Sequence, residues 1–551
     1  MEWARKRGLG GTATAEPDNG LPVHFTKRTM AEWIIDPKSG TAKPSVTRST
    51  AVEIETCGRC HARRSQLSED HRPGKPLLDT HRVALLEPEL YHADGQMQGE
   101  VYNYGSFLQS KMYHSGVTCG DCHEPHAAAL RHPGNATCLQ CHDSKKYDAS
   151  THHHHKADSA ATKCAGCHMP VRTYMVVDPR HDHSFRIPRP DLTVTLGTPN
   201  ACNDCHGDKT PAWAAEAVER WFGPQRKGHQ RFAGALAKGR TFGDGAEQSL
   251  IEIARDADTP GIARATALEL LQSYPSAASM AVVRQDLTAP DPLVRLAAVE
   301  ALQGDAATRW RLGSPLLRDP VRTVRMAAGR TLADALPPES PITDRTALAD
   351  AVREYVDAQQ LNADRPEAHA NLGTLFAQVG EAKRAEAEYK AAIKLSPAFI
   401  PAYVNLADLY KSLGRDADGE QYLKEALTHD ASNAAVHHAL GLLKVRQKRL
   451  PEALDLLQKA AALAPNQPRY AYVHGVALHS TGKVKEGLAV LEQAHQRFPG
   501  EREILTALIT MHRDQGNVEQ AQLYARKLLA QSPEDPQARA LVAEMEKAGK
   551  P

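Results

Sequence analysis

The sequence lacks long apolar runs and has almost no net charge. No run of about eighteen apolar residues occurs in its 551 residues, so no membrane-spanning helix is expected. The formal net charge of +1 gives no overall attraction to nucleic acid, and no nucleic-acid partner is expected. The charged start Met1–Gly8 is not followed by the apolar segment of about seven to fifteen residues that marks a secretory signal peptide.

The chain also lacks any cysteine outside one short motif. Its ten cysteines all belong to five copies of Cys-x-x-Cys-His. The copies are Cys57-Gly-Arg-Cys60-His61, Cys119-Gly-Asp-Cys122-His123, Cys138-Leu-Gln-Cys141-His142, Cys164-Ala-Gly-Cys167-His168 and Cys202-Asn-Asp-Cys205-His206. A Cys-x-x-Cys pair also occurs in zinc sites and redox pairs, but neither requires a histidine directly after the second cysteine. The pattern is typical of covalent haem attachment, so we expect five haem c groups and no structural disulfide.

Histidine is concentrated in the same part of the chain as the motifs. Eighteen of the 27 histidines lie between His24 and His206, and thirteen of these are outside the motifs. The motif histidines are the expected proximal iron ligands, namely His61, His123, His142, His168 and His206. Residues 1–206 contain only six methionines, compared with thirteen histidines outside the motifs. The composition therefore favours bis-histidine ligation.

The candidate distal ligands are histidines that lie between or beside the motifs. They are His81, His92, His114, His126, His154, His181 and His183. His154 belongs to the run His152–His155, of which we expect one or two side chains to face an iron. His183 is favoured over His181 because Pro179 and Pro188 restrict this segment, and Asp182 could orient a neighbouring imidazole. A solvated or hydrogen-bonding role remains the alternative for each of them.

Composition divides the chain into three regions. Residues 1–223 are rich in Pro, Gly and His, and segments such as 130–135 and 179–199 are expected to be loops and turns. In residues 245–340 a phrase recurs at Ala263–Leu271, Val294–Leu302 and Val324–Leu332, each after a proline-marked turn. This predicts paired helices that resemble HEAT repeats, with a plain helical bundle as the alternative.

Residues 347–545 repeat with a period of 34. One glycine column contains Gly380, Gly414, Gly482 and Gly516, with Lys448 in the remaining position. A second column of small residues contains Gly373, Ala407, Gly441 and Gly475, where two helices are expected to approach closely. The period predicts five tetratricopeptide repeats and a groove for a peptide or another protein. The expected fold is mainly α, with a loop-rich multihaem cytochrome domain followed by an α-solenoid.

Four stretches resemble bacterial multihaem c-type cytochromes fused to tetratricopeptide repeats. They are Glu55–Gln66, Tyr104–His123, His181–Pro190 and Gly197–His206. The haem domain is similar to the superfamily of hydroxylamine oxidoreductase and pentahaem nitrite reductase. The resemblance implies a protein exported to the periplasm, with a signal peptide and further haem motifs upstream, so that this chain is a truncated octahaem member.

The resemblance does not transfer an activity. In the pentahaem nitrite reductases the active-site motif ends in Lys, whereas all five motifs here end in His. Tyr102, Tyr104 and Tyr113 are available for the haem–tyrosine cross-link of hydroxylamine oxidoreductases, but the sequence favours none of them.

We therefore expect an iron-binding electron-transport protein that passes electrons along a haem chain, while its repeats dock a redox partner. One alternative is an oxidoreductase that acts on a small nitrogen or sulfur compound at an open haem site. The second alternative is a haem-based redox sensor or scaffold that signals through its repeats, and the sequence leaves open whether the protein is an enzyme.

Overall fold

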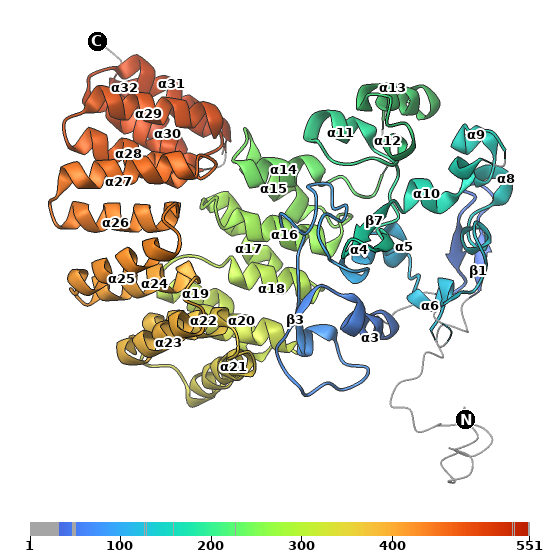
Figure 1. Ribbon diagram of the computed structural model, residues 1–551, viewed down its shortest axis with the longest axis horizontal. Coiled ribbons are helices and arrows are strands. Elements are labelled where there is room, and N and C mark those ends of the chain that lie inside the picture. The colour runs from blue at the N-terminus through green and yellow to red at the C-terminus, as the bar shows by residue number, and fades with distance from the viewer. Residues whose placement is uncertain are drawn as a thin grey trace, which may run out of the picture. The chain divides into compact units, whose positions relative to one another are not determined.

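The computed structural model describes residues 32–46, 51–125, 127, 129–157, 159–225, 228–531, 533 and 535–548. The chain divides into two compact units, Met1–Arg231 (unit 1) and Phe232–Pro551 (unit 2). Most of its elements are helices, as labelled in Figure 1. Within the described ranges, no helix is long and apolar enough to cross a membrane. The expectation of a mainly α fold is confirmed.

Unit 1 consists of short elements. Its strands form four two-stranded antiparallel sheets: β1 (Trp33–Ile35) with β2 (Ala42–Pro44), β3 (Arg64–Gln66) with β4 (His81–Val83), β5 (His123–Glu124) with β6 (Ala129–Leu130), and β7 (Val171–Tyr174) with β8 (Asp178–His181). Its helices are α3 (Val52–His61), η1 (Leu77–Asp79), α4 (Tyr104–Leu108), α5 (Lys111–His114), α6 (Cys119–Cys122), α7 (Ala136–Leu139), α8 (Ser144–Tyr147), α9 (Ser150–His153), η2 (Ala160–Thr162), α10 (Cys164–His168), α11 (Pro190–Leu196), α12 (Ala201–Cys205) and α13 (Pro211–Phe222).

The apolar core of unit 1 is confined to one part of its sequence. Buried apolar side chains such as Leu77, Leu86 and Tyr91 lie between residues 54 and 108. Among the described residues from 109 to 213, Tyr174 alone contributes a buried hydrophobic side chain. Four of the five motifs fall in this second stretch, so the motif-bearing segments have almost no side-chain core of their own.

The segments 130–135 and 179–199 are not loops throughout, which corrects that expectation. Leu130 ends β6, and β8 extends to His181. Pro190 occupies the first turn of α11, where a missing amide hydrogen has no cost, and Gly197 ends the helix in a left-handed conformation with φ 71°. Proline and glycine are the residue types on which the loop prediction was based. Here Pro190 marks the start of a helix and Gly197 marks its end.

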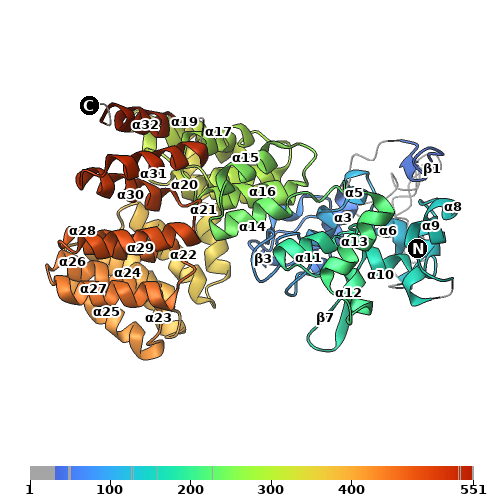
Figure 2. The ribbon, with the colours of Figure 1, turned by 90° about the horizontal axis from the view of Figure 1, so that it is seen from above.

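Unit 2 is entirely helical among its described residues. Its elements are α14 (Ala233–Thr241), α15 (Ala246–Arg255), α16 (Gly261–Leu271), α17 (Ala277–Asp286), α18 (Pro292–Glu300), α19 (Ala306–Gly313), η3 (Ser314–Arg318), α20 (Arg322–Leu332), α21 (Ile342–Leu361), α22 (Pro366–Gln378), α23 (Ala382–Leu395), α24 (Ile400–Ser412), α25 (Asp416–His429), α26 (Ala434–Arg446), α27 (Leu450–Leu463), α28 (Pro468–Ser480), α29 (Val484–Arg497), α30 (Arg502–Asp514), α31 (Val518–Gln531) and α32 (Pro536–Ala548). Figure 1 shows the helices α22 to α29 as successive layers of a stack, and Figure 2 shows the same helices from above.

The recurring phrase of residues 245–340 lies on α16, α18 and α20, and its arginine has a structural role in each copy. Arg264 binds Asp286 at 2.8 Å, and Arg295 binds Asp319 at 2.7 Å. Both aspartates are 4% exposed, so these ion pairs are shielded from water. In the third copy Arg325 binds a glutamate of α21 at 2.6 Å, which links this series of helices to the next one. The arginine therefore recurs because each copy needs it to bind the element that follows.

The glycine column of the 34-residue repeats has a conformational cause. Gly380, Gly414, Gly482 and Gly516 all have positive φ, between 70° and 86°. Lys448, at the same position of the third repeat, has φ 60°. A left-handed backbone is inexpensive for glycine but costs about 1–2 kcal/mol for a residue with a Cβ atom. The turn therefore imposes the conformation whichever residue occupies it.

Unit 2 also has a contact between helices that are far apart in sequence. The Gly500 amide donates to the carbonyl of Phe242 at 2.8 Å, and the rings of Phe242 and Phe498 meet edge to face with centroids 6.4 Å apart. The loop after α14 thus packs against the loop after α29. The first helix of unit 2 is thereby joined to the later tetratricopeptide-like repeats, so its helices form a closed arrangement.

Replacing Lys448 by glycine should stabilise the protein. We expect Lys448→Gly to raise the free energy of unfolding by about 1 kcal/mol, because the strained left-handed residue is replaced by an unstrained one. Lys448→Ala is the control, because it removes the same charge but keeps a Cβ atom. Urea unfolding followed by far-ultraviolet circular dichroism provides the measurement, and a Lys448→Gly protein no more stable than Lys448→Ala would contradict the explanation.

The fragment 347–551 should remain helical when expressed alone. Its helix pairs stabilise one another through neighbour contacts, although the fragment loses the packing of Phe242 against Phe498. We therefore expect a helical circular dichroism spectrum and earlier melting of the last repeats. A disordered spectrum would show that these repeats depend on the rest of the chain.

Candidate functional site

Each Cys-x-x-Cys-His motif is built around a short helix. The motifs lie on α3, α6, α7, α10 and α12, all in unit 1. One helical turn places residues i and i+3 on the same face, so the two thiols of a motif can face one group. Asn200 caps α12 by accepting the amides of Cys202 and Asn203, both at 3.1 Å. None of the ten cysteines, all of which the structure describes, forms a disulfide.

The motifs follow one another in space in their sequence order. The Cys57 and Cys119 thiols are hydrogen-bonding neighbours, and this contact together with burial raises the pKa of Cys119. Cys138 and Cys164 are paired in the same way, which raises the pKa of Cys164. Further electrostatic interactions between motifs join Cys122 with Cys141 and Cys167 with Cys202 and Cys205. Each motif therefore lies beside the next one along the chain.

Three motif histidines have a second histidine ring opposite them. The rings of His123 and His183 have centroids 6.3 Å apart and planes inclined by 27°. β8 ends at His181, and His183 lies two residues later. The β7–β8 hairpin therefore places His183 beside the second motif. His183 is the residue that the sequence favoured in this segment, whereas His181 is exposed and donates its Nδ1 hydrogen to the carbonyl of Met169 at 2.7 Å.

The other two pairs use the run His152–His155. His152 lies 6.0 Å from His168 between ring centroids, with planes inclined by 12°. His155 lies 6.2 Å from His206, with planes inclined by 27°. His154, which the sequence analysis chose from this run, instead stacks on Trp221 at 4.3 Å. His152 and His155 therefore replace His154 as the residues that face motif histidines.

The separation of these ring pairs has a chemical meaning. Two imidazoles on opposite sides of one metal ion, each bonded at about 2 Å, have ring centres about 6 Å apart. The centroids of the three pairs lie 6.0 to 6.3 Å apart, which matches this separation. The donor set at each place, two thiols and two imidazoles, fits a covalently attached haem with histidine on both sides.

Hydrogen bonds to backbone carbonyls orient several of these rings. His168 Nδ1 donates to the carbonyl of Arg186 at 2.8 Å, and His183 Nδ1 donates to the carbonyl of His181 at 2.8 Å. His155 Nδ1 donates to the carbonyl of His153. Because Nδ1 carries the proton in each ring, Nε2 is left as the atom that can bind a metal.

Burial keeps several of these imidazoles neutral. It lowers the pKa of His123, His152, His168 and His183. A neutral imidazole is the form that binds a metal ion, because protonation would occupy the ligating nitrogen.

The remaining histidines that the sequence suggested as distal ligands are His81, His92, His114 and His126. His114 packs against His229, with centroids 4.7 Å apart, and His126 lies outside the described residues. His81 is buried beside Thr80, and burial together with nearby arginines lowers the pKa of His81 to about 4. His92 lies in a turn, where its amide donates to the carbonyl of Gln96 at 2.9 Å. Among the described rings, neither His81 nor His114 contacts a motif histidine.

Two motif histidines have no stacked partner ring. Within the part of the chain that the structure describes, no histidine ring lies against His61 or His142. His142 instead has the ring of Tyr147 edge-on at 5.4 Å, and Tyr147 donates its hydroxyl hydrogen to the carbonyl of Ser39 at 2.8 Å.

A buried polar network supports the segment that contains His183. Arg186 is 7% exposed and binds Asp94, which is 3% exposed, at 3.4 Å. It also donates to Ser184 Oγ at 3.0 Å, while its own carbonyl accepts the hydrogen of His168. The Nη2 atom of Arg186 is buried and has no hydrogen-bond partner among the described residues. A donor of this kind fits a haem propionate, because a buried guanidinium requires a compensating acceptor.

Asp182 has a different role from the expected one. It is 2% exposed, and its carboxylate accepts the amides of Ser184 at 2.8 Å and Met97 at 3.2 Å. It therefore fixes the turn at His183 and ties it to the segment at Met97, and among the described residues it makes no hydrogen bond to an imidazole. The sequence order Asp-His suggested the contact with a ring, but adjacent side chains in an extended segment point in opposite directions.

The first motif is packed against a tyrosine. A Cβ atom on Gly58 would lie 2.6 Å from the ring of Tyr104 and 3.0 Å from Leu77. Tyr104 donates its hydroxyl hydrogen to Glu55 at 3.2 Å, and Glu55 accepts the Leu77 amide at 2.6 Å. Tyr104 thus has a structural role, while Tyr102 lies edge-on to Tyr174 with centroids 6.4 Å apart.

The sequence analysis did not identify the aromatic residues of α13. Trp213 lies 5.1 Å from His206, Trp221 stacks on His154, and Phe222 lies 6.2 Å from His152, all between ring centroids. A cluster of aromatic residues shortly after the fifth motif is the signal that could have indicated them.

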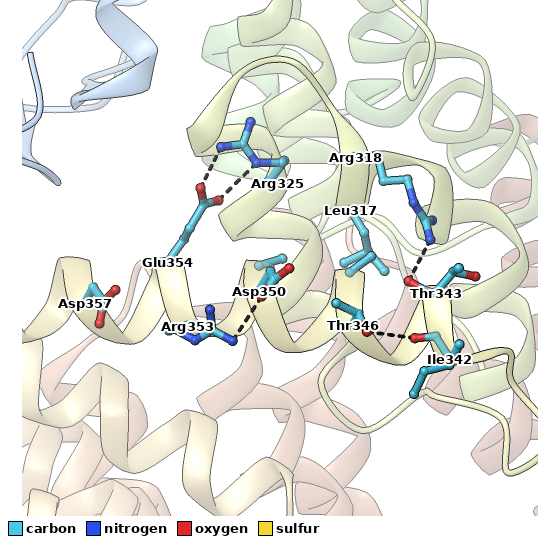
Figure 3. Close-up of a pocket in the computed structure, with 12 residues that line it drawn as sticks. Leu317, Arg318, Arg325, Ile342, Thr343, Thr346, Asp350, Arg353, Glu354 and Asp357 are labelled. Carbon is cyan, nitrogen blue, oxygen red and sulfur yellow. Dashed lines mark hydrogen bonds and ion pairs between the residues drawn. The ribbon is translucent and has the colours of Figure 1, made fainter. Parts of the chain in front are cut away.

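Two of the cavities of unit 2 are lined by residues outside the motifs. One, of about 840 Å³, lies along α21 and is lined by residues of η3, α20 and α21 (Figure 3). Its charged groups bind one another, since Arg325 pairs with Glu354 and Arg353 with Asp350. A smaller cavity of about 180 Å³ among α26, α27 and α28 has apolar lining residues such as Leu442, Leu454 and Val476.

Both the N-terminal and the C-terminal part of the chain contain segments that match known protein families. Residues 366–399, 404–468, 438–502 and 478–545 match tetratricopeptide repeat families. Residues 112–147 match the doubled CXXCH motif, which covers the second and third motifs. The C-terminal region therefore consists of tetratricopeptide repeats, and the paired motif indicates a c-type haem domain.

Individual relatives match only parts of the chain. Human protein O-mannosyl-transferase TMTC1 is 33% identical over 135 residues, which are 24% of this chain and 15% of that protein. The solved structure of Pseudomonas aeruginosa PilF is 19% identical and covers 33% of this chain and 83% of its own, with a TM-score of 0.29. YrrB, described as a tetratricopeptide protein with an unusual peptide-binding site, is 22% identical. The match covers 34% of this chain and 96% of YrrB, with a TM-score of 0.27.

A methyl group on Gly58 should destabilise unit 1. We expect Gly58→Ala to lower the free energy of unfolding by about 1–3 kcal/mol, since the added atom overlaps the Tyr104 ring. Gly166→Ala is the control, because a Cβ atom added to this glycine of the fourth motif would have no other atom within 4 Å. Denaturant unfolding of the two mature variants should separate them. Equal stabilities would contradict the proposed packing of Tyr104 on the motif.

Proposed function

We propose that unit 1 is a multihaem c-type cytochrome domain with five covalently attached haems, and that it transfers electrons from one haem to the next. The observation that carries the proposal is the set of three histidine pairs at 6.0 to 6.3 Å, each of which includes a motif histidine. Haem c would supply a one-electron iron couple at each motif.

The residues have distinct roles in this proposal. The ten motif cysteines hold the cofactor covalently, and the five motif histidines bind from the proximal side. His183, His152 and His155 bind opposite His123, His168 and His206. Histidine on both sides leaves no position for a substrate, so electron transfer is the function that these three places support.

The order of the motifs supports transfer along the chain. Each motif lies beside its neighbour in sequence, as in the contacts between Cys57 and Cys119 and between Cys138 and Cys164. Short separations between redox groups are what successive one-electron steps require. The hydrogen bonds at Nδ1 and the buried Asp94–Arg186 pair hold the imidazoles in fixed orientations, which limits reorganisation when the charge changes.

The repeats provide the interaction region of the proposal. Tetratricopeptide repeats bind peptides or proteins, and we propose that those of unit 2 dock a redox partner. We also propose that the protein acts in an exported compartment such as the periplasm, because covalent haem attachment is performed there. The resemblance to the hydroxylamine oxidoreductase superfamily, and to octahaem members with further motifs upstream, is part of this proposal.

Mature protein should contain five covalent haems. We expect denaturing mass spectrometry to show five haem additions, because five complete motifs are present and every cysteine belongs to one. Cys202→Ser combined with Cys205→Ser should remove one addition and leave four. Fewer than five additions in fully matured protein would contradict the stoichiometry.

His183→Ala should convert one low-spin haem to high spin without loss of covalent haem. The variant removes the imidazole opposite His123 and should raise the potential of that haem. Electron paramagnetic resonance of the oxidised protein provides the measurement, and added imidazole should restore the low-spin signal. His181→Ala is the control, because this ring bonds the Met169 carbonyl. An unchanged spectrum for His183→Ala would show that His183 binds no iron.

A further inference from the structure

The run His152–His155 faces two different motifs, which a regular helix would not allow. His152 is in α9 and lies opposite His168 of the fourth motif, whereas His155 lies opposite His206 of the fifth. In a continued helix, residues three apart lie on the same face. The chain must therefore change direction between these two histidines.

The change of direction occurs at His154. Its backbone is left-handed, with φ 56° and ψ 25°, and its amide donates to the Ser150 carbonyl at the end of α9. This conformation is unfavourable for a residue with a Cβ atom, so the surrounding structure must favour it. The geometry at His154 determines where the side chains on either side of it point.

The ring of Trp221 lies against the ring of His154. The two rings are stacked, with centroids 4.3 Å apart and planes inclined by 10°. Phe222 lies edge-on to both His154, at 5.7 Å, and His152, at 6.2 Å. Aromatic pairs of this kind contribute stability beyond their buried area, which offsets the cost of the left-handed conformation.

The helix that carries Trp221 is itself fixed to the fifth motif. α13 begins at Pro211, five residues after His206, with Thr210 capping it by accepting the amide of Trp213 at 3.3 Å. Trp213 lies 5.1 Å from the ring of His206. Ala214, Ala217 and Val218 of α13 are buried, which anchors the helix. The helix thus holds Trp221 at a constant position relative to the fifth motif.

We propose that Trp221 is a positioning residue that holds His154 in its left-handed conformation, so that His152 and His155 bind the irons of the fourth and fifth motifs. The inference rests on the proposed function, because it requires haem at both motifs. One contact would then control the ligation of two neighbouring haems. Loss of Trp221 should affect both together, whereas loss of His152 or His155 should affect one.

The test compares spin states in the full-length mature protein. Trp221→Ala should produce a high-spin signal that corresponds to as many as two of the five haems, with five covalent additions retained. Trp221→Phe, which keeps a stacking ring, should remain low-spin. His152→Ala and His155→Ala should each convert one haem, and added imidazole should restore the low-spin state in every case.

A double-mutant comparison separates positioning from direct ligation by His154. His154→Ala should resemble Trp221→Ala, and the two changes combined should have no larger effect, because both remove the same contact. A low-spin spectrum for Trp221→Ala with five haems attached would overturn the inference and leave the proposed function intact. Absence of haem from the fourth and fifth motifs of the unaltered protein, measured on haem peptides, would overturn the proposed function and the inference with it.

Discussion

The hydrogen bond from an imidazole Nδ1 to a backbone carbonyl is the interaction on which the organisation of unit 1 depends. It fixes both the tautomer and the direction of the ring, and it leaves Nε2 as the ligating atom. His168 and His183 make it at 2.8 Å to the carbonyls of Arg186 and His181, in one segment whose backbone Asp182 holds in place. The ring pairs have centroids about 6 Å apart, a separation that suits an iron between them.

The two units achieve stability by different means. Unit 2 repeats the same local packing. Its helix pairs bury their apolar faces against one another, and arginines such as Arg295 bind the next element. Unit 1 has almost no apolar core among the described residues from 109 to 213, where polar interactions such as the buried Asp94–Arg186 pair hold the motif segments. A large covalently bound macrocycle would supply the apolar surface that the side chains there do not. The placement of the histidines and the scarcity of a core therefore have the same explanation.

The sequence predicted the features that depend on local or periodic patterns. The tetratricopeptide region, the close approach of helices at Gly373, Gly441 and Gly475, and the turn at Lys448 all follow from a 34-residue period. Which histidine of the run 152–155 faces a motif could not be predicted, because it depends on the left-handed backbone at His154 and on Trp221, 67 residues later. The contact of Gly500 with Phe242 was equally inaccessible, since it joins segments about 260 residues apart. Long-range contacts of this kind leave no periodic signal in the sequence.

The most direct test of the account is the location of the irons in a crystal of the mature protein, determined from their anomalous scattering. The account predicts iron centres between His123 and His183, between His168 and His152, and between His206 and His155. It also predicts thioether bonds from both cysteines of each motif. Irons bound at these motifs by other residues opposite the motif histidine, or no iron between any of the three pairs, would contradict it.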